Sequence, residues 1–460
     1  MNALQRIDSW PRTRRPLPWL FAFFLASVFL IPVDGVHLKV NLPFSSDYGR
    51  FLILLIAIVW LGGVVLSRRS GRIRLRPRYW ATAMIGFLAV AVLSIVLNYG
   101  RITNLGELSV AEKKLFVLFG LLALFAIFAV SLRVTELRAF GVLIVILATL
   151  ASLGTIYEQK SGENIFYTTA SSVLSPIASV DPAPTEGEKT GRPMIAGPTR
   201  HALSLDSLLG MAAPFAVAFA AFSPSTRRRL LWGLLACVIV SGALVTQRRS
   251  GAVVPAVAIL AIFAMRPRKL MPLLPYALVA VVVGLIFSGG QINAVTDLFN
   301  GGNEASTDGR TSDYEAVVPD VLSHPAIGRG FGTHNSIMHD TYRIFDNGYL
   351  DLVYEVGLIG LLVWLAMVLL PVFQARYAAR SDNPLRGPPA LAASAGLLAF
   401  GVATALYDVL SFPQAPYLFV FLAAMCTCAA SVERVAPRIS VRRVAGVARR
   451  RRERPVPSAT

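Results

Sequence analysis

Long apolar runs recur along this 460-residue chain, and they constrain its fold more than any other feature. Most are about 17–25 residues long, the length that a helix needs to cross the hydrocarbon core of a bilayer. Because backbone N–H and C=O groups in lipid must be satisfied within their own segment, we expect these runs to be helices. The sequence predicts twelve of them, over residues 17–33, 50–67, 80–97, 115–132, 139–157, 203–222, 229–247, 250–265, 271–289, 348–373, 388–407 and 415–432.

The composition supports the same fold class, an all-α integral membrane protein. Hydrophobic residues make up 55% of the chain and charged residues 15%, whereas a soluble domain carries about 25% charged residues. No small-residue cleavage site follows the first run, so we expect a retained helix rather than a removed signal peptide. The three cysteines fall inside apolar runs and have neither disulfide nor metal-ligand spacing.

The loops between the runs carry an asymmetric charge that predicts the orientation. If alternate loops lie on opposite sides, the side with both termini holds 30 basic and 5 acidic residues, and the other side holds 14 basic and 21 acidic residues. Because basic loops stay in the cytoplasm, we expect both termini there. The net charge of +18 is therefore an orientation signal, with membrane lipids as partners of the basic tail, and it does not indicate nucleic-acid binding.

This orientation divides the chain into helical groups and two long outer loops. A loop as long as the second one is unusual unless it is functional. The predicted parts are five helices in 1–157, an outer loop at 158–202, helices six to nine in 203–289, a large outer loop with a short helix at 290–347, three helices in 348–432, and a basic cytoplasmic tail at 433–460.

The stretch TQRRSG places Arg248 and Arg249 side by side in a short connector on the outer, acidic side. Charges at membrane depth usually face a cavity or a partner rather than lipid. Two explanations without a functional role stay open for these arginines: snorkelling to outer headgroups, and an ion pair with an acid such as Glu355 or Asp408.

The second outer loop contains GRGFG at 328–332 and the histidines His324, His334 and His339. GRGFG lacks the Lys-Ser/Thr ending of a phosphate loop, so its glycines are expected to serve tight turns and close approach to a ligand. The histidine spacing does not favour zinc, and we predict no metal and no cofactor. A general base for a sugar hydroxyl is a better use of His or Asp beside an outer cavity, although solvated loop histidines remain the alternative.

Two acids follow at the start of the tenth predicted helix. Asp351 and Glu355 are four residues apart on one helix face, where a carboxylate is costly unless it is paired or wet. Arg249, Arg310 or Arg329 could pair with them. Arginine's planar fork also suits phosphate oxygens, so the cluster favours a pyrophosphate-linked substrate near the outer leaflet.

Together these motifs resemble the O-antigen ligase/polymerase superfamily, integral membrane enzymes that ligate or polymerise lipid-linked glycans. The similarity is clearest over residues 190–375. TQRRSG, with Arg249, is similar to the family's Ser-Arg-Gly turn, and GRTSDYEAVVPDVLSHPAIGRGFG, with Arg310 early and Gly330 and Gly332 late, resembles its loop helix and Pro-x-x-Gly-x-Gly ending. DNGYLDLVYEVGLIGL resembles its His-Asn-x-Tyr-Leu…Glu-x-Gly-Leu-x-Gly-Leu motif, and RPMIAGPTRH, with Arg192, is a weaker match.

The resemblance implies metal-independent transfer of a saccharide from undecaprenyl pyrophosphate to an acceptor hydroxyl, at the outer face of a bacterial plasma membrane. It implies that the arginines hold the diphosphate and that a base takes the acceptor's proton. Asp346 stands where the family often has His, so the base is left open among Asp346, His334 and His339. The remaining residues are Arg248, Arg249, Arg310 and Arg192 for the diphosphate, with Asn347, Tyr349, Glu355, Gly330 and Gly332 in support.

Two other functions stay open. A non-enzymatic flippase or transporter of lipid-linked sugars or other anions would also need charges in a membrane, but it should place them along a path through the bilayer. A structural membrane scaffold would leave the outer arginines and acids unexplained. Ligase and polymerase need the same diphosphate site and base, so the sequence does not separate them.

Overall fold

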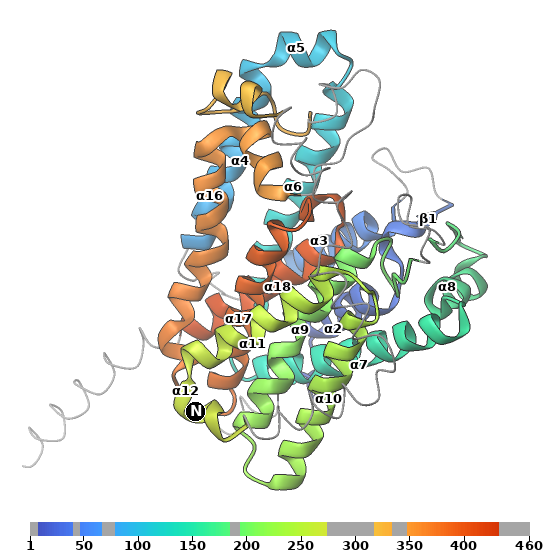
Figure 1. Cartoon of the computed structure of the whole chain (residues 1–460), viewed down its shortest axis with the longest axis vertical. Helices are drawn as coiled ribbons and strands as arrows, with labels where there is room; N and C mark the ends of the chain where they lie inside the picture. Colours follow the sequence, from blue (N-terminus) through green and yellow to red (C-terminus); the bar gives the residue numbers. More distant parts are fainter. Residues whose placement is uncertain are drawn as a thin grey trace, which may run out of the picture.

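A computed structural model describes residues 8–39, 47–66, 79–184, 194–273, 317–333 and 347–431, and these are mostly helical (Figure 1). The long helices are α2 (Pro16–Leu30), α3 (Tyr48–Leu66), α4 (Tyr79–Leu97), α6 (Leu108–Ser131), α7 (Leu137–Ser161), α9 (Ala202–Ala221), α10 (Thr226–Leu244), α11 (Arg249–Met265), α16 (Gly348–Ala379), α17 (Gly387–Thr404) and α18 (Gln414–Ala430). Shorter elements are α5 (Tyr99–Asn104), α8 (Ile165–Leu174), α12 (Pro267–Leu270) and the 3-10 turns η1 (Val33–Gly35), η2 (Met271–Leu273) and η4 (Val409–Ser411).

The chain is a multi-helix membrane protein, as its apolar runs predict. Seven described helices are long and apolar enough to cross a bilayer, or eight if the bent pair α11 with α12–η2 is one span. Helices α2 and α18 lie on predicted runs but are shorter, with 15 and 17 residues. The run at 271–289 lies mostly outside the described residues, so twelve spans remain a prediction.

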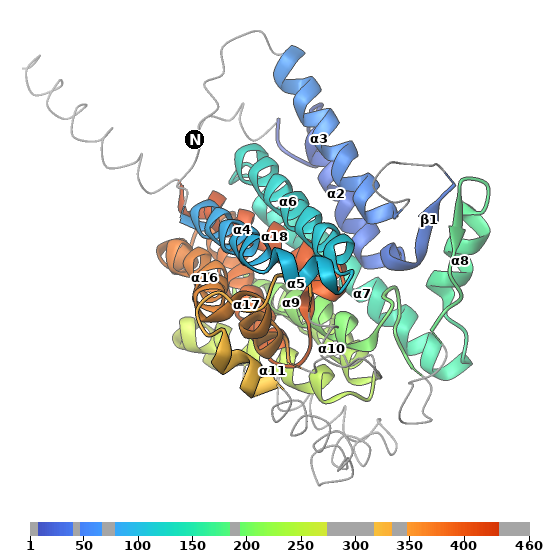
Figure 2. The ribbon, with the colours of Figure 1, turned by 90° about the horizontal axis from the view of Figure 1, so that it is seen from above.

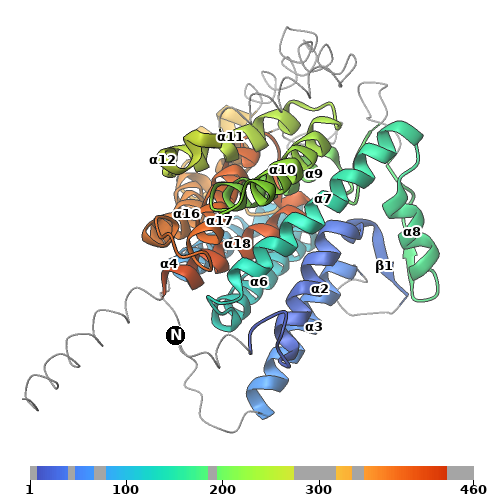
Figure 3. The same cartoon turned by 90° about the horizontal axis from the view of Figure 1, so that it is seen from below.

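Helices α9, α17 and α18 form the centre of the bundle. In the most apolar 18-residue stretches of α9 and α17, 89% of the residues are buried, whereas in that of α3 only 22% are buried. Figures 2 and 3 accordingly show α3 at the periphery. Small residues let the central backbones approach: a Cβ on Gly396 of α17 would lie 2.8 Å from the carbonyl oxygen of Met211 in α9.

The helix ends separate into two groups. At one end, which we name the basic end, Glu136 is buried and pairs with Arg15, and Arg266 pairs with Asp382. The opposite end, which we name the site end, holds α5 and the connections at 201–207, 246–250, 347–351 and 404–414; α5 is at the top of Figure 1. The alternation of the predicted loops agrees with this grouping. Which end faces outward stays a prediction.

A small sheet at the site end joins two connections that are far apart in sequence. Strand β1 (Val36–Leu38) pairs antiparallel with β2 (Ala178–Val180), and Val36 lies opposite Val180. The His37 side chain adds two contacts to this sheet: its Nδ1 lies 3.2 Å from Asp47 Oδ1, and its Nε2 lies 3.3 Å from Asp181 Oδ2. The described part of the loop predicted at 158–202 contains α8 and β2.

Helix α16 is broken at Gly357, where φ is 68° and ψ is −172°. The segment PAIGRG, residues 325–330, fills the break. Its Pro325 carbonyl accepts the Leu358 N–H at 2.9 Å, and its Arg329 N–H donates to the Tyr354 carbonyl at 2.8 Å. Irregular backbone at membrane depth persists only where such groups are satisfied by protein. The segment therefore substitutes for the missing helical hydrogen bonds.

The glycines of GRGFG lie close to neighbouring helices. Gly328, Gly330 and Gly332 all have positive φ, at 71°, 122° and 82°. A Cβ on Gly328 would lie 2.5 Å from the backbone of α16, and one on Gly332 would lie 2.9 Å from the backbone of α6. At Gly330 the nearest neighbour is the Ile102 side chain of α5. Approach of these glycines to a ligand stays a prediction.

We predict that Gly357→Ala destabilises the protein by about 1–3 kcal/mol or more, since an L-residue is strained at this φ. Its Cβ would also lie 2.3 Å from the Ala326 carbonyl. Thermal unfolding of the purified protein in detergent measures the effect. Gly62→Ala in α3 is the matched control because nothing lies within 4 Å of its Cβ position. Equal unfolding midpoints for the two variants would contradict the break's importance.

Candidate functional site

Four charged side chains meet at the site end of the bundle. Lys114 of α6 lies with its Nζ 3.1 Å from Glu355 Oε1 and 4.0 Å from Asp408 Oδ2. Asp351 of α16 also interacts electrostatically with Lys114. All three carboxylates are buried. A buried carboxylate is costly unless a partner compensates it, so Lys114 is the residue that allows these acids to sit here.

The start of α16 positions two of these acids. Asn347 caps the helix, because its Oδ1 accepts the N–H groups of Tyr349 at 3.0 Å and Leu350 at 3.4 Å. The Tyr349 hydroxyl donates to the Gly401 carbonyl at 2.6 Å, which ties α16 to α17. Asn347 and Tyr349 therefore hold the start of α16 in place, and their supporting role at the site stays a prediction.

Glu355 is fixed by its backbone as well as by its side chain. Ser94 of α4 donates its hydroxyl to the Glu355 carbonyl at 2.7 Å, and the Gly330 N–H donates to the same carbonyl at 3.1 Å. The residue lies two positions before the break at Gly357. The break and its filling segment thus hold the carboxylate that Lys114 pairs with.

The pairing suggested from sequence is wrong for two of the described arginines. Arg329 pairs with Asp320 rather than with Asp351 or Glu355. The partner of Glu355 is Lys114, which sequence reasoning missed because the apolar run was begun at residue 115. Helix α6 begins at Leu108, so Lys114 lies almost two turns inside it. The sequence did offer a signal for this pair, because Lys114 directly precedes the apolar run predicted at 115–132.

The arginine turn TQRRSG joins α10 to α11 at the site end. Arg248 is the N-cap residue of α11, and Arg249 is its first residue. Both side chains are half-buried, and neither has an ion pair among the residues that the structure describes. The Nε atom of Arg249 is buried without a hydrogen-bond partner there. Among the described residues the turn therefore presents two arginines without an ion pair, and neither pairs with Glu355 or Asp408; Arg248 has only a longer-range electrostatic interaction with Asp206.

Tyr407 connects the acids to α9. Its hydroxyl donates to Ser207 Oγ at 2.9 Å, and it directly precedes Asp408. Burial raises the pKa of Tyr407, and Asp206 and Asp408 raise it further, so it stays a neutral donor. Asp408 in turn accepts the Leu410 N–H at 3.0 Å. The site end is thus one polar network from α6 through the connection between α17 and α18 to α9.

A second basic pair lies beside α5. The Arg101 Nη2 donates to Thr333 Oγ1 at 3.4 Å, while its Nε and Nη1 are buried without partners among the described residues. Burial lowers the pKa of Arg101, and the neighbouring Arg329 lowers it further. Asp320 compensates Arg329, so this pair differs from the arginine turn.

Several predicted site residues lie outside the described residues. They are the candidate bases Asp346, His334 and His339, and the candidate diphosphate ligands Arg310 and Arg192. Their roles remain predictions. Among the residues that are described, no three His, Cys, Asp or Glu side chains gather as metal ligands would.

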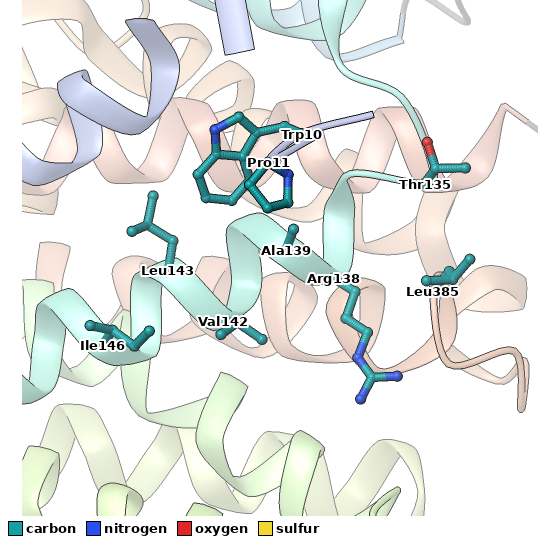
Figure 4. Close-up of a pocket in the computed structure, with 9 residues that line it drawn as sticks. All are labelled: Trp10, Pro11, Thr135, Arg138, Ala139, Val142, Leu143, Ile146 and Leu385. Carbon is teal, nitrogen blue, oxygen red and sulfur yellow. The ribbon is translucent and has the colours of Figure 1, made fainter. Parts of the chain in front are cut away.

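A groove of about 390 Å³ lies away from this network, at the basic end of the bundle. Trp10, Arg138 and apolar side chains along α7 line it (Figure 4). The Trp10 ring stacks on Phe140 at a centroid distance of 4.7 Å. Because it holds no acid and lies at the other end of the helices, it is not the candidate site.

We predict that Lys114→Met lowers stability by about 3–5 kcal/mol, since it leaves buried carboxylates uncompensated. Lys113→Met is the matched control, because that neighbour is exposed. Adding Glu355→Gln to Lys114→Met should recover part of the loss, as expected for coupled partners. Thermal unfolding in detergent checks these variants together with the single variant Glu355→Gln, which completes the cycle. A double variant as unstable as the sum of the singles would contradict the pairing.

Asp34, in η1, gives a pH prediction. Burial raises its pKa from 3.8 to about 7; nearby Asp47 adds to the shift and Arg200 opposes it. The folded state then holds this proton more tightly than the unfolded state, so Asp34 should reduce stability progressively as pH rises from about 4 to about 7. Asp34→Asn should remove this decline. Unfolding midpoints measured across that range test it, and a pH-independent difference between the two proteins would contradict it.

Comparison with known proteins places a family match over this site. Residues 241–365 match the family model described as O-antigen ligase. The match runs from the end of α10 through the arginine turn to the first part of α16, and it includes Glu355. No curated protein matches the chain. The resemblance to the O-antigen ligase/polymerase superfamily is confirmed for this region, which supports a general role in surface-polysaccharide synthesis.

Proposed function

We propose, with the O-antigen ligase match as premise, that this protein transfers a saccharide from a polyprenyl-pyrophosphate donor to an acceptor hydroxyl. The reaction would take place at the outer face of a bacterial plasma membrane. The observation that carries the proposal is the arginine turn, where Arg248 and Arg249 lie at the site end without an ion pair among the described residues.

Two adjacent arginines without an ion pair among the described residues suit a diphosphate leaving group. Negative charge grows on the bridging oxygen as the bond from the anomeric carbon to the diphosphate breaks, and fixed cations stabilise that charge. A guanidinium can hold two phosphate oxygens with parallel N–H groups. We assign Arg249 and Arg248 to this role, together with Arg310 and Arg192. Such cations supply the electrostatic stabilisation that a divalent ion provides in other enzymes.

The acceptor side needs a base. As the acceptor oxygen forms its bond to the anomeric carbon, its proton passes to the base, and the diphosphate leaves with the electron pair of the broken bond. We propose Asp346, His334 or His339 for this step. Asp346 directly precedes Asn347, the cap of α16, which leads into the Lys114 network.

Glu355 supports this site rather than taking the proton in our proposal. Its carboxylate is already paired with Lys114 at 3.1 Å, and its backbone is held by Ser94. An ion pair of this kind keeps the start of α16 in one position. Gly330 contributes to the same support by its hydrogen bond to the Glu355 carbonyl.

A transporter of lipid-linked sugars is the alternative. The described charges of the polar network gather at one end of the bundle, whereas a translocation path would distribute them along the helices. Purified protein in vesicles separates the two functions. Movement of labelled lipid-linked glycan across the bilayer without transfer would favour transport and contradict our proposal.

We predict that Arg249→Ala abolishes surface-glycan formation in a strain that lacks the native gene, because the diphosphate loses its fixed cation. Loss of one such contact typically costs about 100- to 1000-fold in rate. Gel analysis of extracted polysaccharide measures the product, and immunoblotting of membranes verifies the protein level. Arg268→Ala is the matched control, since this exposed arginine lies at the basic end. Normal glycan in a well-expressed Arg249→Ala strain would sink the proposal.

A further inference from the structure

The arginine turn is a tight and strained connection. Gln247, which precedes the two arginines, has a φ of 55°, in the left-handed region that is uncommon for residues other than glycine. A Cβ on Gly251 would lie 2.2 Å from the Ala243 carbonyl oxygen, so the chain folds back closely on α10. A turn of this kind persists only when its surroundings determine it.

The first turn of α11, which carries Arg249, is weakly held by its own backbone. Pro255 lies inside α11 and has no N–H to donate to the carbonyl of Gly251. The Gly251 N–H donates to the Arg248 carbonyl at 3.1 Å, only three residues back. The position of Arg249 therefore depends on contacts from other helices.

Asp206 of α9 supplies such a contact. Its Oδ2 accepts the Ser250 hydroxyl at 2.6 Å, and both residues are buried, with 0% and 2% exposure. Ser250 is the residue directly after Arg249. Asp206 also interacts with the Thr246 side chain and electrostatically with Arg248. One carboxylate thus touches or faces both sides of the arginine pair.

A second contact lies one helical turn deeper on the same two helices. A Cβ on Gly210 would lie 2.5 Å from Val254 Cγ1, so α9 and α11 meet closely there. The pairs Asp206–Ser250 and Gly210–Val254 are each four residues apart along their helices. Together they fix both the height and the rotation of α11 against α9.

We infer that Asp206 is a positioning residue that aims Arg249 at the donor diphosphate through its hydrogen bond to Ser250. This inference rests on the proposed function and adds a residue to it. The bond holds the weak first turn of α11, so its loss lets the guanidinium move from its place. A displacement of about 1 Å in a positioned group can cost about 100-fold.

The test measures binding of undecaprenyl pyrophosphate to the purified full-length protein in detergent. Asp206→Ala and Ser250→Ala should each raise the Kd about 10- to 100-fold. Asp206→Asn and Ser250→Thr should restore near-native binding, because the amide oxygen still accepts and the threonine hydroxyl still donates. The double variant Asp206→Ala/Ser250→Ala should be no weaker than either single variant, since both remove one bond.

A matched control separates positioning from general packing. Ser204 is buried on the same helix, and its hydroxyl has no partner among the described residues. Ser204→Ala should leave both Kd and the unfolding midpoint near native. A purely structural Asp206 would lower the unfolding midpoint in Asp206→Ala and leave the Kd of the folded protein unchanged, which would overturn the inference. An Asp206→Asn protein as weak as Asp206→Ala would also overturn it, because charge and not the bond would then matter.

The outcomes also separate this inference from the proposed function. If Arg249→Ala binds undecaprenyl pyrophosphate normally, the proposed function fails. If Arg249→Ala loses binding while Ser250→Ala keeps a native Kd, only the role of Asp206 fails. Undecaprenyl monophosphate serves as the second probe, and we expect a smaller effect of each variant on it because one phosphate makes fewer contacts.

Discussion

The fold of the site depends on the hydrogen bonds that fill the break in α16. An interrupted helix inside a bilayer leaves N–H and C=O groups that lipid does not satisfy, and each costs several kcal/mol. Residues 325–330 supply the missing partners on both sides of Gly357. The break also places Glu355 just before the bend, where Lys114 reaches it. Residues 325–330 are thereby hydrogen-bonded into α16, the helix that carries Asp351 and Glu355.

Charge compensation divides the site end into two regions with different chemistry. The acids around Lys114 are paired with it or face it, so they serve as fixed supports. Arg248 and Arg249 lie without an ion pair among the described residues, so they remain available for an anion. Polar groups of Tyr407, Ser207 and Asp206 connect the regions through α9. An anionic substrate would complete the balance of charge at the arginine turn.

Much of this could be predicted from sequence, because some of the determinants are local. Eleven of the predicted apolar runs coincide with described helices, since hydrocarbon allows hardly any other backbone structure. TQRRSG stood out because adjacent arginines broke the charge pattern of the other outer connectors. The DNGYL motif marked the start of α16, and the structure adds that Asn347 forms its cap. His334, His339 and Arg310 stood out as polar residues of the second outer loop, the family resemblance added Asp346 as a candidate base, and the roles of all four stay predictions.

The sequence by itself determined the membrane class of this protein, most of its helices and the location of its unusual charges, because each follows from the composition of one contiguous segment. The tertiary structure alone decided which charges are compensated. Lys114 and Glu355 are 241 positions apart, and Asp206 and Ser250 are 44 apart. Such pairs form only when helices pack in one register, and close contacts such as that of Gly210 with Val254 set that register. The residue pattern of one segment does not reveal how that segment packs against another, so it does not predict which charges pair.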